Sequence, residues 1–265
     1  MARLAFDGYL THLRDESARF RAVLTDCDPE ARVPGCPEWT AADLLWHLAG
    51  VQRFWATIIG TRPAGPGEHD ELARPATYEE MLTAYDDHSA ALVAELEAAD
   101  PAEVAWSWAP EQTVGFTFRR QAHEALIHRL DAEQTAGQVT ALDPELAADG
   151  VDEALAVMFG GKPAWGSFSG LPHHVRVDIA DTGESVWVQL GTFSGTDPES
   201  EQSYADEPDI DVVVDPGTEP DAVVSGAAGV LDAWLWRRGD DAEIAVTGDR
   251  GIYDRFREAV NHPID

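Results

Sequence analysis

The stretch HEALIHRLDAEQTAG, from His123 to Gly137, decides how the N-terminal half of this chain is interpreted. Its opening resembles the HExxH motif of zinc proteases, but it contains one extra residue. On a helix, His123 and His128 lie roughly 140° apart and cannot both face one ion. Glu124 and His128 are only about 40° apart, on successive turns. The pattern therefore excludes the protease motif and leaves Glu124 and His128 as the pair that shares a helix face.

Outward from this stretch, the N-terminal half reads as amphipathic helices. Apolar residues at helical spacing predict helices over residues 6–24, 40–60, 77–100 and 116–137. The second helix starts at Thr40 or in the region of Trp39, and Thr40 with Asp43 forms a plausible capping arrangement. Thr77 opens the third helix, and Pro101 and Gly137 end the third and fourth. Four such helices favour a bundle.

The second half changes character and predicts an α+β domain. Short β-branched runs predict strands over residues 173–181, 185–191, 209–215 and 242–249. Helices are expected over residues 144–161, 219–239 and 250–260, and residues 195–209 are expected to form a charged, solvated loop. We place the domain boundary between Gly137 and Gly161, which gives domains of residues 1–140 and 141–265.

Composition narrows the possible functions. The net charge of −31 argues against nucleic acid and against anionic membrane surfaces, since both are bound through Lys and Arg. No apolar run approaches the length of a membrane span, and Cys27 and Cys36 show no disulfide or CxxC spacing. We therefore expect an acidic, soluble, cytoplasmic protein with reduced thiols. We also expect a monomer.

A metal site that used Glu124 and His128 requires a third ligand from a facing helix. His47 lies in the middle of the apolar second helix, where an imidazole without a partner is costly. Taken alone, His47 or the Glu124–His128 pair is an ordinary polar feature of a helix. Together they form a His₂Glu set, which suits zinc with one position left open. Asp131 is either a hydrogen-bond acceptor for His128 or a helix-face carboxylate.

The remaining histidines fit a metal site less well. Four of them stand among acidic or turn residues and are expected to face solvent: His12, His69, His88 and His262. His173 and His174 open a predicted strand.

Two segments carry a family resemblance. VPGCPEWTAADLLWHLAG (residues 33–50) and RRQAHEALIHRLDAEQTAG (residues 119–137) resemble the mycothiol-dependent maleylpyruvate isomerase family, and VSGAAGVLDAWLWRRG (residues 224–239) is a weaker third match. The resemblance implies a DinB-like four-helix bundle followed by a small α+β domain like a sterol carrier protein. It also implies a zinc ion held by a histidine on the second helix and a Glu-x-x-x-His pair on the fourth. These correspond to His47, Glu124 and His128.

The resemblance further implies a chemistry. A low-molecular-weight thiol, mycothiol in the family, binds zinc and ionises. The thiolate adds to the cis double bond of maleylpyruvate, the C–C bond rotates, and elimination gives the trans product. Relatives that transfer the thiol keep the adduct. Arg238 corresponds to the family arginine that binds substrate, although this chain has Arg237–Arg238 before Gly239 where the reverse order is commoner. Three other arginines are alternatives or else form surface ion pairs: Arg53, Arg119 and Arg120.

Two other functions remain open at this point. The first is a zinc hydrolase that uses metal-bound hydroxide and needs no thiol. The second is a metal-binding or interaction module without catalysis. Dependence of turnover on added thiol distinguishes the isomerase or S-transferase from the hydrolase.

Overall fold

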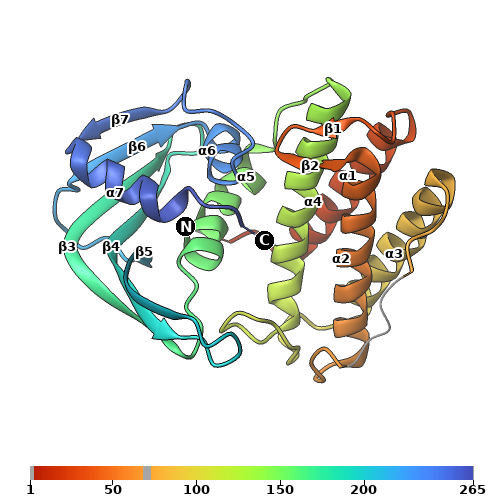
Figure 1. Cartoon of the computed structure of the whole chain (residues 1–265), viewed down its shortest axis with the longest axis horizontal. Coiled ribbons are helices and arrows are strands. Elements are labelled where there is room, and N and C mark those ends of the chain that lie inside the picture. The colour runs from red at the N-terminus through yellow and green to blue at the C-terminus, as the bar shows by residue number, and fades with distance from the viewer. Residues whose placement is uncertain (1–2, 68–72, 265) are drawn as a thin grey trace. The chain divides into compact units, whose positions relative to one another are not determined.

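The chain combines helices and a sheet in two compact units. The computed structural model describes residues 3–67 and 73–264 (Figure 1). One unit comprises Leu4–Leu142, and the other contains the chain from Asp143 onward. The first unit is mainly helical, whereas the second contains the main sheet. His69, which the sequence placed in solvent, lies outside the described residues.

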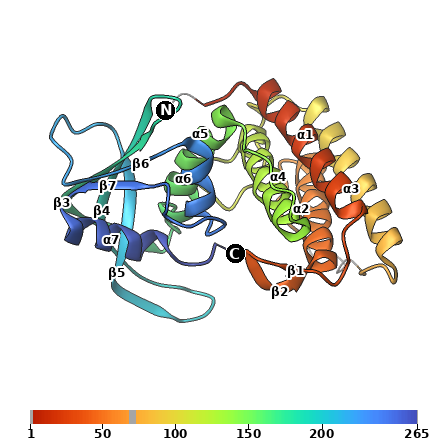
Figure 2. The same ribbon diagram turned by 90° about the horizontal axis from the view of Figure 1, so that it is seen from above.

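The N-terminal unit is built on four long helices. These are α1 (Phe6–Thr25), α2 (Ala41–Thr61), α3 (Tyr78–Ala98) and α4 (Val114–Ala136). Helix α1 packs mainly on α4, and α2 mainly on α3, while α2 and α4 also touch (Figure 2). The connection after α1, which the sequence predicted only as a connection, contains a small antiparallel pair, β1 (Arg32–Val33) and β2 (Cys36–Thr40).

Capping residues fix where these helices begin and end. The Asp43 backbone N–H donates to Thr40 Oγ1 at 3.2 Å, and the Thr40 N–H donates to Asp43 Oδ2 at 2.9 Å. This confirms the predicted capping box. Thr77 caps α3 in the same way. Gly137 ends α4 with φ of 67°, a left-handed conformation that glycine adopts without steric cost. The start of α2 therefore places His47 two turns from a well-defined helix end.

Apolar side chains of α1, α2 and α3 form one buried cluster. Burial of each large aliphatic side chain contributes about 1.5–3 kcal/mol. The fully buried members that fix α2 in place are Leu44, Leu45 and Leu48, packed with Phe20 and Leu24 of α1. His47 is next to these residues in sequence, but it is only half-buried. The three leucines therefore fix α2 in the buried cluster, whereas His47 lies at the border of that cluster.

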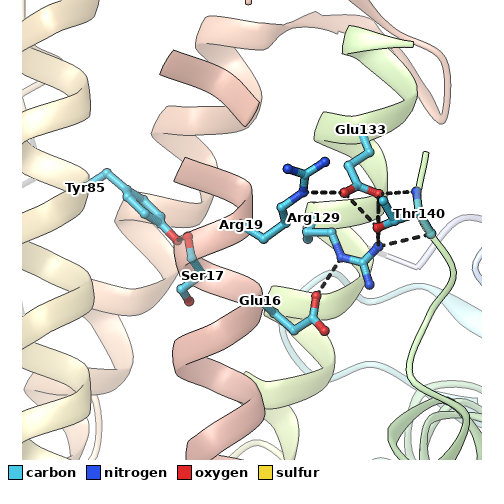
Figure 3. A network of polar contacts seen from close by, with 7 residues as sticks. All are labelled: Glu16, Ser17, Arg19, Tyr85, Arg129, Glu133 and Thr140. Atoms are coloured by element: carbon cyan, nitrogen blue, oxygen red, sulfur yellow. Dashed lines mark hydrogen bonds and ion pairs between the residues drawn. The ribbon is translucent and has the colours of Figure 1, made fainter. Parts of the chain in front are cut away.

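A buried ionic network joins α1 to α4 (Figure 3). Arg129 Nε donates to Glu16 Oε2 at 2.6 Å, and Arg129 Nη1 donates to Glu133 Oε2 at 3.0 Å. Glu133 also accepts from Arg19 Nε at 2.7 Å and from the Thr140 N–H at 2.7 Å. Buried charges are tolerated when they are paired in this way. We call these five residues the paired network.

The C-terminal unit contains a five-stranded mixed sheet in the order β5-β4-β3-β6-β7. Its strands are β3 (Gly166–Ile179), β4 (Glu184–Thr196), β5 (Ser203–Val213), β6 (Ala222–Gly226) and β7 (Ala245–Gly248). Its helices are α5 (Pro144–Glu153), followed by a π-helical turn η1 (Ala154–Phe159), then α6 (Ala228–Leu235) and α7 (Arg250–Val260). All strand pairs are antiparallel except β3 with β6. Helix α7 lies across β5, β3 and β6 (Figure 1).

Two sequence predictions for this unit were wrong. Residues 219–239 do not form one helix: Ala222–Gly226 is strand β6, and the helix begins only at Ala228. The strand forms because Ala222, Val224 and Gly226 are buried on alternate positions beside β3. The charged segment 195–209 is not a loop throughout. Its second half belongs to β5, whose backbone pairs with β4 although its side chains are charged.

Candidate metal centre

Side chains from α2 and α4 meet at one point of the N-terminal unit. Glu124 Oε1 lies 3.1 Å from His128 Nε2 and 3.5 Å from His47 Nε2. One potential ligand atom from each of the three residues lies within 4.8 Å of the others. The structure therefore brings together the same three residues that helical spacing and the family resemblance selected.

A neighbouring carboxylate orients His128. Asp131 is fully buried, and its Oδ2 lies 3.0 Å from His128 Nδ1. A carboxylate accepts hydrogen bonds, so Nδ1 carries the proton that it donates to Asp131. The other ring nitrogen, Nε2, is then directed to the cluster, as in metal-binding histidines. Of the two roles that the sequence left open for Asp131, the hydrogen-bond acceptor is the one observed.

Arginine orients Glu124. Arg120 Nη2 donates to Glu124 Oε2 at 2.7 Å, so that Oε1 is the oxygen that faces both imidazoles. Burial alone would raise the pKa of Glu124. The Arg120 charge and the hydrogen bonds to His128 and His47 instead hold it well below its ordinary value. Glu124 is therefore a carboxylate throughout the physiological pH range.

Trp39 is a residue of this site that the sequence analysis did not assign. Its ring centroid lies 4.7 Å from that of His47 and 6.4 Å from that of His128. Trp39 stands at the end of β2, one residue before the cap of α2, and is half-buried. In the sequence, the only indication of this role is that a tryptophan stands immediately before the capping residue of the helix that carries His47. The Trp39 ring restricts the orientation of both histidine rings.

The donor set fits a divalent metal. For tetrahedral zinc with bonds of about 2.0–2.1 Å, neighbouring ligand atoms are roughly 3.3 Å apart. The 3.1 Å and 3.5 Å separations around Glu124 Oε1 lie on either side of this value. Two imidazoles and one carboxylate also leave a fourth position for an exogenous ligand.

Without a metal, a proton is favoured at the same place. Burial acts to lower the pKa of His128, but the hydrogen bonds to Asp131 and Glu124 outweigh it and raise the pKa to about 9. The metal-free site at neutral pH is then an imidazolium between two carboxylates. A metal ion that binds there must displace this proton.

Other residues singled out from the sequence lie elsewhere in the N-terminal unit. His123 is fully buried, and its ring packs edge-on against Tyr9 of α1 at 6.2 Å. It is therefore not among the clustered donors. Arg119 and Arg120 are buried, so the expectation of surface ion pairs was wrong for both, whereas Arg53 is exposed. The expectation of solvent exposure was wrong for His88. This residue is half-buried, and its Nδ1 lies 3.1 Å from the Ala49 carbonyl oxygen.

Arg238 lies in the C-terminal unit, just after α6. Its backbone N–H donates to the Ala233 carbonyl at 2.7 Å, and its Nη1 donates to the Trp236 carbonyl at 2.7 Å. The preceding Arg237 has a φ of 61° and is exposed. The double arginine therefore forms the C-terminal turn of α6. Binding of a substrate carboxylate by Arg238 stays a prediction.

The fold and the site define a class: a mixed helix-and-sheet protein whose helical unit carries a His-Glu-His cluster suited to a metal. None of the described helices has the length and apolar character needed to cross a membrane.

Sequence comparison identifies the family. Residues 10–133 match the mycothiol maleylpyruvate isomerase N-terminal domain, and residues 145–255 match the MDMPI C-terminal domain. The chain belongs to the mycothiol-dependent maleylpyruvate isomerase family, as the two sequence segments indicated. No curated protein matches the sequence significantly.

Solved structures support the fold. A crystal structure of the mycothiol-dependent maleylpyruvate isomerase is 14% identical, with a TM-score of 0.58 over 92% of this chain and 93% of that one. A histidine-to-alanine mutant of that isomerase gives a TM-score of 0.60 at the same identity and coverage. A structure titled UbiJ-SCP2 ubiquinone synthesis protein covers 45% of this chain with a TM-score of 0.22, too low to carry an argument. The likeness to a sterol carrier protein stays a prediction.

Proposed function

We propose that this protein is a zinc- and mycothiol-dependent isomerase or S-transferase that acts on small electrophiles such as maleylpyruvate. The observation that carries the proposal is the convergence of His47, Glu124 and His128, whose potential ligand atoms all lie within 4.8 Å of one another. The family to which the chain belongs supports the choice of thiol and substrate class. The proposed architecture is a DinB-like bundle of residues 1–140 with a companion domain of residues 141–265.

The chain's own groups have distinct roles in this proposal. A zinc ion held by the three ligands would supply a Lewis acid that ionises a thiol at the open position. Asp131 keeps the proton of His128 on Nδ1, which leaves Nε2 free to bind the metal. Arg120 keeps Glu124 anionic and turns one oxygen to the site. Trp39 packs on the His47 ring and limits its rotation.

The proposed isomerisation consumes no oxidant or reductant. The thiolate sulfur forms a bond to one carbon of the cis double bond, and the π electrons move onto the conjugated carbonyl. The former double bond is then single and rotates. Return of the electrons breaks the C–S bond, which gives the trans isomer and regenerates the thiolate. In an S-transferase, a proton from solvent is added to the neighbouring carbon instead, and the C–S bond is kept.

Arg238 is the proposed partner of a substrate carboxylate. A guanidinium matches a carboxylate with two parallel hydrogen bonds, and few cations are available in a chain with 18 Lys and Arg against 49 Asp and Glu. The neighbouring Arg237 is exposed and provides a matched control. Arg238→Ala is expected to raise KM for a carboxylated electrophile at least tenfold, as the loss of a charged hydrogen bond implies. Arg237→Ala is expected to leave KM unchanged.

The first test measures metal content and thiol dependence together. Inductively coupled plasma mass spectrometry of the wild type should give one zinc per chain, and the variants His47→Ala, Glu124→Ala and His128→Ala should each lose it. His88→Ala, which removes a half-buried histidine of the same unit, should keep it. Wild-type protein that takes up no zinc contradicts the proposal. Iron in place of zinc would instead point to an oxygenase-type use of the same donors.

A measurement of turnover without thiol distinguishes the zinc hydrolase from the proposed isomerase or S-transferase. The zinc hydrolase alternative uses a metal-bound hydroxide and predicts hydrolysis at full rate in the absence of any thiol. The isomerase or S-transferase predicts no conversion of maleylpyruvate until thiol is added. A zinc-loaded protein that binds no thiol and converts no electrophile would favour the third alternative, a metal-binding module without catalysis.

A further inference from the structure

The two imidazole rings of the candidate metal centre are oriented by different means. His128 has a carboxylate behind it, since its Nδ1 lies 3.0 Å from Asp131 Oδ2. For His47, no group among the described residues accepts a hydrogen bond from Nδ1, and its one polar side-chain contact in that part of the chain is the 3.5 Å approach of Nε2 to Glu124 Oε1. Histidines that bind metals almost always donate to such an acceptor, which fixes the orientation of the ring. The orientation of His47 therefore has to come from another contact.

Aromatic contacts supply this orientation. The Trp39 ring lies 4.7 Å from the His47 ring, and the two planes are tilted by 43°. The His128 ring lies 4.8 Å from the His47 ring in an edge-on arrangement of 73°. The rings of Trp39 and His128 are 6.4 Å apart, so that His47 contacts two separate rings. Such contacts depend on the angle between the planes, and a turn of the His47 ring about its Cβ–Cγ bond would alter both.

The backbone that carries Trp39 is fixed on both sides. Strand β2 pairs with β1, and Arg32 stands opposite Thr40, the residue that follows Trp39. One position further on, the Ala41 N–H donates to the Ala31 carbonyl oxygen at 2.9 Å. The Trp39 side chain also packs against the buried cluster of the helical unit. The small β1–β2 pair therefore has a consequence for the candidate metal centre, because it holds an aromatic ring against one potential ligand.

Of the three potential ligands, His47 has the most contact with solvent. Its side chain is 34% exposed, compared with 17% for Glu124 and 9% for His128. His47 is also the only one of the three that comes from α2, whereas the other two share α4. Water can therefore reach the His47 side of a bound metal ion more easily than the side formed by α4.

This asymmetry indicates the order in which the ligands release a metal ion. Glu124 is held by Arg120 at 2.7 Å, and His128 is held by Asp131 at 3.0 Å. Both can keep their positions when the His47 ring turns away. Release should therefore begin at His47, and looser positioning of its ring should raise the dissociation rate of the metal. Association begins at the Glu124–His128 pair and should change little.

We propose that Trp39 is a positioning residue that takes the place of a hydrogen-bond acceptor for His47 and thereby controls how fast the metal exchanges with solvent. The proposal rests on the proposed function, since it assumes a metal ion held by His47, Glu124 and His128. Trp39 acts through His47 and is not itself a ligand, because an indole nitrogen only donates hydrogen bonds. Glu124 and His128 form the fixed part of the site, and His47 forms the part that opens.

The rate of zinc release from the full chain tests this. Zinc-loaded protein is mixed with an excess of a chromophoric chelator, and the absorbance change gives the release rate, while a titration gives the equilibrium affinity. Trp39→Leu should release zinc about 10–100-fold faster and bind it more weakly by a similar factor, the size of effect that a lost orienting contact has on metal affinity. Trp39→Phe keeps an aromatic ring and should recover most of this loss. If Trp39→Leu folds poorly, Trp39→Met fills more of the space and should show the same faster release.

A neighbouring tryptophan provides the matched control. Trp46 is half-buried and packs against the same cluster as Trp39, so Trp46→Leu should lower the melting temperature of metal-free protein without changing the release rate. A Trp39 that serves packing alone would behave in the same way, and an unchanged release rate in Trp39→Leu overturns the inference. Release from Trp39→Phe as fast as from Trp39→Leu overturns it as well. Wild-type protein that binds no zinc overturns the proposed function itself.

Discussion

Helix α4 buries charged groups both on the side that faces α1 and on the side that meets His47. The charged groups on these two sides are paired in different ways. On the α1 side, Arg129 and Glu133 belong to the paired network, in which each charged group has protein partners (Figure 3). On the other side, Glu124 Oε1 and His128 Nε2 converge on one point with His47 Nε2. Nearby, the amide atoms of Gln121 have no hydrogen-bond partner among the described residues. We call this second side the ligand face.

The difference shows which buried polar groups serve stability and which serve binding. A closed network satisfies its own hydrogen bonds and has no capacity for a ligand. A face with directed but incompletely paired groups costs stability until a ligand arrives, which is typical of functional sites. The same helix thus carries an anchor on one side and a binding surface on the other.

The largest expected effect comes from breaking the paired network. Arg129→Met leaves Glu16 and Glu133 as buried carboxylates without their shared cation, and should lower the free energy of unfolding by about 3–5 kcal/mol. His47→Ala on the ligand face should change metal-free stability by less than about 1 kcal/mol. Urea denaturation of both variants measures this. Arg14→Ala, which removes an exposed ion pair of α1 with Glu97, serves as the control and should cost at most about 1 kcal/mol. Equal losses in Arg129→Met and His47→Ala would contradict the comparison.

The two sides should also respond to pH in opposite directions in metal-free protein. The pKa of His128 is raised to about 9 from an unfolded value near 6.5. Protonation of His128 therefore contributes up to about 3 kcal/mol to the free energy of unfolding. This contribution is complete below about pH 6.5 and is lost as the pH rises through about 9.

On the other side, burial would raise the pKa of Glu133, but hydrogen bonds from Arg19 and Thr140 hold it below its ordinary value. Ionised Glu133 therefore contributes to the free energy of unfolding above about pH 4.5, and this contribution is lost on acidification. Urea unfolding between pH 3 and pH 10 should therefore show losses at both ends. His128→Ala should remove the alkaline loss alone. An alkaline loss that persists in this variant would mean that another group causes it.

A smaller effect is expected from the residue behind His128. Asp131→Asn preserves the shape of the side chain but removes the charge that fixes the Nδ1 proton, and should weaken zinc binding about 10–100-fold. Competition with a chromophoric chelator at pH 8 gives the affinity. Asp43→Asn, a carboxylate of the same unit outside the ligand face, should leave zinc affinity unchanged. An unchanged affinity in Asp131→Asn would show that the hydrogen bond does not tune the metal.

The smallest effect sharpens the comparison at Gly50. Because a Cβ meets no atom there, Gly50→Ala should stabilise metal-free protein by about 0.5–1 kcal/mol through helix propensity. Gly115→Ala provides the matched opposite, since its Cβ would lie 2.8 Å from the Phe6 ring and 3.2 Å from the Pro101 carbonyl oxygen. Differential scanning calorimetry should show a higher melting temperature for the first variant and a lower one for the second. A lower melting temperature for Gly50→Ala would mean that the space is not open in solution.

Local signals made much of the helical unit predictable. Thr40, Thr77 and Gly137 are capping residues whose effect depends on neighbours within a few positions, and all three stand at helix ends. The Glu124–His128 pair follows from the helical repeat alone. The choice of His47 rested on its place in the middle of an apolar helix, where an imidazole needs a partner, and the family resemblance implied the same residue.

What the sequence did not predict depends on how elements pack. Strand β6 was taken for helix because Ala222–Gly226 runs directly into α6, and only its pairing with β3 marks it as a strand. The rings of Trp39 and His47 meet because strand β2 runs directly into α2, which no periodicity indicates. That Glu124 and His128 face His47 depends on the rotation of α4 relative to α2, which becomes visible only from contacts between the two helices.

The paired network also has a mechanical consequence for the candidate metal centre. Arg129 directly follows His128 on α4, and Glu133 stands about one and a half turns beyond it. Their bonds to Glu16 and Arg19 resist rotation of α4 about its own axis. Coordination geometry tolerates angular errors of only about 10–20°. The ion pairs on one side of α4 therefore set the angular precision with which two ligand atoms are presented on the other. A substitution in the paired network is therefore expected to change the alignment of Glu124 and His128 although it alters neither residue.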